Sequence, residues 1–197
     1  MIFTKNKITK KDLVLLFFCL ILPVFLLLLS YKVVLFFTNT TPAQEHVFSF
    51  LDGKGNLPAG FTESEVSHLQ DVQQVIKKGN YVFYVLLLML TITLSYYKKE
   101  MEFIQKLLNY GGKTTLVTVL IILFTSFFFF DTVFTLFHFL FFPQGNWLFP
   151  VNSMLIQTFP LDFFVTISRN IFFLTLFWGI LFILLIYYLR YVYCNRN

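Results

Sequence analysis

The sequence predicts an all-α membrane protein with four transmembrane helices, an extracytoplasmic amphipathic helix and a capping loop. Of its 197 residues, 57% are hydrophobic and only 13% are charged, about half the charged share of a typical soluble domain. Four apolar stretches are each long enough to cross a hydrocarbon core of about 30 Å. We therefore expect residues 1–197 to form a single membrane domain.

The apolar stretches place the four spans along the chain. The predicted spans cover residues 13–37, 81–97, 114–142 and 163–193, and the two outer loops cover residues 38–80 and 143–162. The first stretch follows a lysine-rich segment, as the core of a signal peptide would. It is too long for a signal peptide, and no small-residue cleavage pattern closes it. We therefore expect it to remain as an uncleaved anchor.

Lysine and arginine residues set the expected orientation, because cytoplasmic segments of membrane proteins carry an excess of them. Four lysines precede the first span and four more lie in residues 98–113, whereas residues 143–162 contain no lysine or arginine. Both termini are therefore expected in the cytoplasm, and both long loops on the outer face of the plasma membrane. These flanking lysines account for the net charge of +5, so no nucleic-acid partner is expected.

The first outer loop contains a predicted helix that carries a histidine. Residues 62–65 form a capping box, and apolar residues recur at helical spacing as far as Lys78. We expect this helix to end at Gly79 and to lie along the outer membrane surface. His68 and Asp71 are three residues apart, so they are neighbours on its face.

The third span carries two ionisable residues near its outer end. At about 1.5 Å per residue, Asp131 lies in the outer third of the hydrocarbon core and His138 lies near its boundary. Their spacing places them on nearly the same helix face, with Thr135 between them. Ionisable side chains at this depth are costly and are by default read as functional. We therefore expect a polar stripe that faces a pocket open to the outside.

Three further residues are candidates for roles at the outer face. The second outer loop is rich in proline and aromatic residues, including Trp147, and is expected to cap the bundle at the level of the lipid headgroups. Arg169 lies near the outer end of the fourth span. It either extends its long side chain to the membrane interface or contacts a lipid headgroup or an oxyanion. His46 is expected to be a surface loop residue.

Two histidine motifs in this order resemble those of a known family. The matching residues are His68-Leu69-Gln70-Asp71-Val72, Asp131, Phe137-His138, Phe141, Trp147, Pro150, Leu155-Ile156, Pro160 and Phe163. From about Phe48 to Phe163 the chain resembles the lipoprotein intramolecular transacylases, four-span membrane enzymes of the bacterial cell envelope. The resemblance implies an acyltransferase that acts on diacylglyceryl lipoproteins within membrane lipid. Such an enzyme moves the sn-2 acyl chain from the glyceryl group to the α-amino group of the same cysteine, which gives a lyso-form lipoprotein.

The resemblance also implies that His68 and His138 are the catalytic residues. Four residues are expected to support them: Asp71, Asp131, Trp147 and Arg169. No cofactor and no metal ion are expected, and the protein is expected to be a monomer. The chain departs from the family pattern at three loop positions where acidic residues are common, namely Phe149, Ser153 and Leu161.

Histidine can serve this reaction because it titrates near neutral pH, so it can take a proton from an amine and return one to an alcohol oxygen. We assign His138 as the base, since it lies on a rigid span with an anion nearby, and His68 as the acid. Two alternatives stay open. The two histidines and two aspartates could form a metal site, although the sequence has no metal-binding motif. A non-catalytic protein that binds lipid or a partner through its outer loops would tolerate replacement of both histidines by glutamine.

Overall fold

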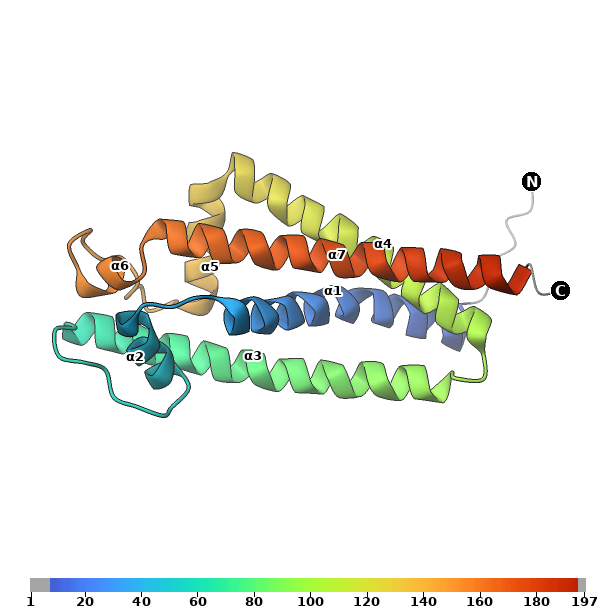
Figure 1. Cartoon of the computed structure of the whole chain (residues 1–197), viewed down its shortest axis with the longest axis horizontal. Coiled ribbons are helices and arrows are strands. Elements are labelled where there is room, and N and C mark those ends of the chain that lie inside the picture. Colours follow the sequence, from blue (N-terminus) through green and yellow to red (C-terminus); the bar gives the residue numbers. More distant parts are fainter. Residues whose placement is uncertain (1–7, 195–197) are drawn as a thin grey trace.

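The computed structural model describes residues 8–194, and this part of the chain is helical without strands (Figure 1). The helices are α1 (Lys10–Phe37), α2 (Pro42–Leu51), α3 (Glu63–Tyr96), α4 (Met101–Phe128), α5 (Phe130–Phe141), α6 (Met154–Thr158) and α7 (Leu161–Cys194). Four of them, α1, α3, α4 and α7, are long and apolar enough to cross a membrane. The predicted fold class is therefore confirmed.

The four long helices form one bundle in which α4 packs against both α1 and α7, and α3 packs against α1. The start of α1, the turn between α3 and α4 and the end of α7 lie at one end of the bundle, while α2 and α6 lie at the other (Figure 1). At the first end, Lys11 forms an ion pair with Glu100. The short helices α2 and α6 thus lie at the end of the bundle opposite the start of α1 and the end of α7.

Small residues allow the long helices to approach closely, as is common in membrane bundles. A Cβ atom on Gly112 of α4 would lie 3.0 Å from the carbonyl oxygen of Gly179 on α7. Between α1 and α7, the hydroxyl of Thr175 donates a hydrogen bond to the hydroxyl oxygen of Ser30; the two oxygens are 2.9 Å apart, and both residues are fully buried. These contacts fix the middle of the bundle, from which α4 diverges towards the end that holds α2 and α6 (Figure 1).

Helix α3 differs from the prediction because it continues through Gly79. The predicted capping box is confirmed at its start, where the Thr62 side chain accepts from the backbone N–H of Glu65 and the Thr62 N–H donates to the Glu65 carboxylate. A glycine inside a helix costs only about 1 kcal/mol, which unbroken backbone hydrogen bonds on both sides offset. The expected surface helix is therefore the first half of α3. The uncharged, apolar half that crosses the membrane begins after Lys78.

The third span also differs from the prediction, because it consists of two helices. Helix α4 begins at Met101, earlier than expected, and ends at Phe128. Phe129 has φ −135° and ψ 41°, which lies outside the helical region, and α5 then turns back towards α3 (Figure 1). This turn brings the end of α5 to the start of α3, where Phe142 is buried.

A small core outside the membrane holds the two outer loops against α3. Helix α2 was not predicted; Thr41 caps it together with Gln44, and Pro42 occupies its first turn, where a missing N–H is harmless. The buried side chains of this core come from both loops and from α3: Val47, Leu51, Leu69, Leu155 and Phe159. His46 is exposed as expected, although it lies on α2 and not in an irregular loop.

Candidate active site

His68 lies on the first half of α3 and points into a group of aromatic rings. Its ring meets Phe142 edge-on at 4.7 Å between centroids, and Phe149 lies at 5.5 Å. The residue is only 8% exposed, and its Nδ1 atom is buried without a hydrogen-bond partner. Packing therefore fixes the imidazole in place while leaving one of its nitrogens unpaired.

His138 lies in the last turn of α5, where the main chain of its own helix sets its protonation pattern. Its Nδ1 atom is 2.8 Å from the carbonyl oxygen of Phe134. A carbonyl oxygen can only accept, so Nδ1 carries the hydrogen and Nε2 of the neutral ring keeps a free lone pair. The ring also packs on Trp147, with 4.7 Å between centroids.

The structure brings the two histidines together on the ring of Phe142. This phenylalanine is buried, and the centroid of the His138 ring lies 5.8 Å from it, on a helix separate from that of His68. Two imidazoles that contact one aromatic ring can act on the same bound molecule. The Phe142 side chain cannot transfer a proton, and the sequence gives no indication that both histidines contact it.

Asp71 binds the second outer loop to α3. Its carboxylate accepts a hydrogen bond from Gln144 and another, 2.8 Å long, from Nδ2 of Asn146. Gly145, between these two residues, has φ +79°, a left-handed conformation that glycine adopts without strain. The sequence indicated Asp71, but gave no signal for Gln144 or Asn146, because their partner lies more than seventy positions away.

Glu65 is a buried carboxylate that joins the same loop to the start of α3. It is 1% exposed and accepts from the backbone N–H of Leu155 at 2.8 Å and from that of Thr62 at 2.7 Å. Burial alone would raise the pKa of this carboxyl, but the hydrogen bonds from Leu155 and Thr62 outweigh it, so the pKa is lowered. The sequence indicated only the cap, not the bond to Leu155.

The environment of His68 keeps its ring neutral at physiological pH. His68 precedes the apolar half of α3, so it lies outside the membrane-spanning segment. Burial and, to a smaller extent, the positive charge of a protonated His138 together lower the pKa of its imidazole to about 4, against the smaller opposing effects of Asp71 and Asn146. His68 is therefore available to accept a proton over a wide pH range.

The other predicted residues lie in different surroundings. Asp131 is exposed at the start of α5 and makes no hydrogen bond or ion pair with His138 or any other residue in 8–194. Arg169 is exposed on α7 and is likewise unpaired within the described chain. Trp147 lies against His138, and its indole Nε1 is buried without a partner. Across residues 8–194, no three His, Cys, Asp or Glu side chains gather closely enough to hold a metal ion.

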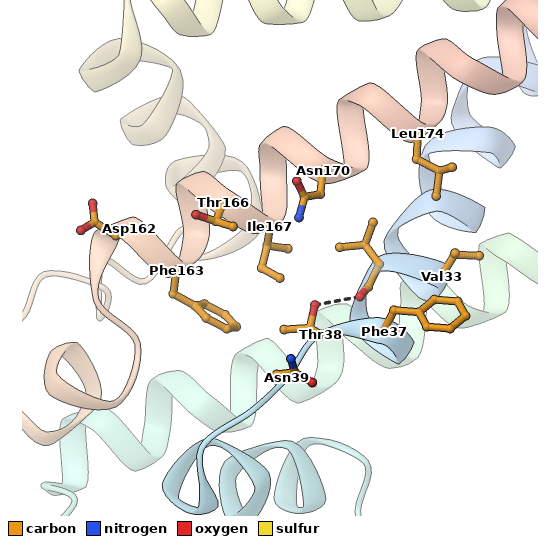
Figure 2. Close-up of a pocket in the computed structure, with 11 residues that line it drawn as sticks. Val33, Phe37, Thr38, Asn39, Asp162, Phe163, Thr166, Ile167, Asn170 and Leu174 are labelled. Atoms are coloured by element: carbon orange, nitrogen blue, oxygen red, sulfur yellow. Dashed lines mark hydrogen bonds between the residues drawn. The ribbon is translucent and has the colours of Figure 1, made fainter.

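A separate cavity of about 630 Å³ lies between the end of α1 and the start of α7 (Figure 2). Polar side chains of α7 recur along its wall at helical spacing, namely Asp162, Thr166 and Asn170, beside apolar residues of both helices. Thr38 lines it too, but its hydroxyl already donates to the carbonyl oxygen of Val34 at 2.7 Å. None of the six predicted site residues lines the cavity.

A bundle of four helices long and apolar enough to cross a membrane, with two imidazoles that contact one aromatic ring, defines a polytopic membrane protein with a histidine pair. The family model for the lipoprotein intramolecular transacylase Lit matches residues 43–164, which is more than half of the chain. The chain therefore belongs to the lipoprotein intramolecular transacylase family, a family of membrane enzymes.

Solved structures agree with this family. The in meso structure of the membrane integral Lit from Bacillus cereus has a TM-score of 0.73 at 20% identity, over 94% of this chain and 97% of that chain. A variant of that protein with a histidine replaced by arginine has a TM-score of 0.78 at 20% identity, over 95% of each chain. One with alanine instead has a TM-score of 0.77 at 21% identity, over 94% of this chain and 95% of that chain. A search of curated proteins finds no match. At these identities the structural likeness shows a shared fold.

Proposed function

We propose that this chain moves the sn-2 acyl chain of a diacylglyceryl-cysteine lipoprotein to the α-amino group of the same cysteine. The observation that carries the proposal is the contact of both imidazoles with the ring of Phe142, in a chain of the transacylase family. Donor and acceptor belong to one substrate molecule. The protein therefore has to bring them into line and move one proton.

The chemistry balances without a cofactor. The amine nitrogen forms a bond to the ester carbonyl carbon, the bond from that carbon to the glyceryl oxygen breaks, and one proton passes from the nitrogen to the glyceryl oxygen. Holding the reacting groups in line contributes on the order of 7–11 kcal/mol. Proton transfer by positioned side chains adds about 10²–10⁴-fold.

Burial favours the opposite assignment of base and acid to the one proposed from the sequence, where His138 was the base and His68 the acid. An acid at His68 would need an imidazolium ion, which desolvation at this site disfavours. We therefore assign His68 as the neutral base that accepts the proton of the amine. His138 is less buried and contacts the same Phe142 ring, so we assign it the other role, donation of a proton to the leaving oxygen.

The tetrahedral intermediate also needs a hydrogen-bond donor for its oxyanion. Trp147 offers one, because its Nε1–H is unpaired and buried beside the ring of His138. A buried donor without a partner is rare and calls for an explanation. An oxygen that becomes negatively charged during the reaction supplies that partner at the step where it stabilises most.

The orientation and partners follow the same proposal. With both termini cytoplasmic, the histidines face the outside, where diacylglyceryl lipoproteins are held in membrane lipid. One chain supplies both imidazoles, so a monomer is sufficient and no nucleic acid takes part.

Mass spectrometry of lipoprotein N-termini tests the proposal. Cells that express the protein should contain N-acylated, S-monoacylated cysteine, and His68→Gln or His138→Gln should reduce it by about 10²–10⁴-fold with normal insertion. His46→Gln is the matched control, since this histidine is exposed on α2. Full transacylation by the double variant of His68 and His138 would exclude a catalytic role for either and favour a binding protein.

A further inference from the structure

We propose that Asn146 is a positioning residue that holds His68 with its hydrogen on Nδ1, so that Nε2 faces the substrate as the proton acceptor. The claim about the tautomer depends only on the geometry of the loop and α3. Its catalytic consequence rests on the proposed function.

The hydrogen bonds of Asn146 fix which way its amide points. Its Nδ2 atom lies 2.8 Å from an oxygen of Asp71 and 3.2 Å from the hydroxyl oxygen of Ser67. An ionised carboxylate has no hydrogen to donate, so the amide nitrogen, and not its oxygen, must face Asp71. The amide oxygen Oδ1 therefore points away from Asp71.

Two unpaired atoms remain, and they are complementary. Oδ1 of Asn146 and Nδ1 of His68 are both buried, and neither has a partner at hydrogen-bonding geometry. The hydrogen bonds of Asn146 to Ser67 and Asp71, one residue before and three residues after His68 on α3, hold its amide beside the imidazole. Asn146 also has a small effect that raises the pKa of the imidazole, against the larger lowering by burial. A buried oxygen that can only accept, next to a ring nitrogen, selects the tautomer with hydrogen on that nitrogen.

The same arrangement then holds at both histidines. The Phe134 carbonyl places the hydrogen of His138 on Nδ1, and Asn146 does so for His68. With Nδ1 held in this way, Nε2 is the atom that exchanges the proton in both rings, as the acceptor in His68 and as the donor in protonated His138; a main-chain acceptor holds one ring and a side chain of the second outer loop holds the other. The turn at Gly145, with φ +79°, sets where Asn146 lies, so the conformation of this loop decides which nitrogen of His68 can react.

Nitrogen-15 NMR of protein labelled only at histidine reads the tautomers directly. The chain has three histidines, and exposed His46 serves as the internal reference. We expect His68 of the full-length protein in lipid nanodiscs to show hydrogen on Nδ1. Asn146→Ala should move the hydrogen to Nε2 or mix the two tautomers. Gln144→Ala, which removes the other bond from this loop to Asp71, should leave the tautomer of His68 unchanged.

Activity separates a positioning role from a merely structural one. Removing the partner that orients a metal-ligating histidine costs about 10–100-fold, and we expect Asn146→Ala to lower kcat by a factor of this order with little change in KM. Asn146→Asp alone should be worse, since two carboxylates would meet. Combining it with Asp71→Asn exchanges the two groups and should restore both the tautomer and kcat.

Hydrogen on Nε2 of His68 in the unmodified protein would overturn the inference, whether or not the Asn146 variants fold. An unchanged tautomer in folded Asn146→Ala would also overturn it. If the proposed function fails, no N-acylated product forms, and the tautomer measurement still decides the role of Asn146.

Discussion

Replacing Trp147 by phenylalanine should lower activity without lowering stability. The substitution keeps an aromatic ring beside His138 and removes the indole N–H, which is buried and unpaired. A buried donor without a partner costs about 1–3 kcal/mol, and the smaller ring gives back part of this through lost contacts, such as the one with Phe139. We expect the free protein to be unchanged or up to about 1 kcal/mol more stable. We expect kcat to fall by about 10²–10³, the loss typical of an oxyanion donor.

Two measurements on the same preparations test this expectation. Thermal unfolding in detergent gives the stability, and mass spectrometry of N-acyl cysteine under single-turnover conditions gives the rate. Trp178→Phe is the matched control, because Trp178 on α7 also has a buried, unpaired Nε1 but packs against the core of the membrane bundle. It should show the same relief in stability and no change in rate. A Trp147→Phe protein that keeps its full rate would refute the role of the indole N–H.

Three further predictions concern topology, pH and the buried carboxylate. On intact cells, a cysteine introduced at exposed Ser64 should react with a membrane-impermeant thiol reagent, and a cysteine introduced at exposed Lys99 should not. Labelling at Lys99 and not at Ser64 would show the opposite orientation in the membrane. The pKa of His68 is about 4 in the folded state and about 6.5 when unfolded, so the unfolded chain binds more protons between these values. Stability measured by thermal unfolding should therefore fall as pH drops from about 6.5 to about 4, less steeply in His68→Gln; equal slopes would contradict the assignment. Glu65→Ala leaves the N–H of Leu155 without its carboxylate partner. In denaturant unfolding, this variant should have a free energy of unfolding lower by about 3 kcal/mol. A decrease below about 0.5 kcal/mol, the range of ordinary surface substitutions, would show that the contact is dispensable.

Hydrophobicity and capping chemistry are local, and for this reason the sequence predicted most of the fold. Each span can be predicted from the hydrophobicity of its own residues, and the capping box at Thr62 forms within a single helix turn. The break at Phe129 could not be predicted, because it falls in a run of phenylalanines with no glycine or proline. At Gly79 the sequence predicted a helix end that the structure does not have, because a single glycine is a weak stop signal when the helix continues on both sides.

The residues of the candidate site could likewise be predicted only where the signal is local in the sequence. The histidines could be proposed because ionisable residues are rare in such a chain, and Asp71 because it is three residues from His68. The supporting role expected for Asp131 has no counterpart in its contacts, since the main chain at Phe134 takes the place next to His138. Asn146 escaped notice because an asparagine in a loop has no distinctive pattern, and only the packing of that loop on α3 gives it a partner.

The apolar surface of α5 has a bearing on why this chain would transfer an acyl group and not release it as a fatty acid. Phe137, Phe139 and Leu140 are exposed on either side of His138. Exposing such surface to water costs about 25 cal/mol per Å², so contact of this face with the acyl chains of a bilayer is favoured over contact with water. An ester can then meet the imidazoles without leaving its oily surroundings, and water is scarce there. Where the effective concentration of the substrate's amine exceeds that of water, the amine is the nucleophile that attacks the carbonyl carbon.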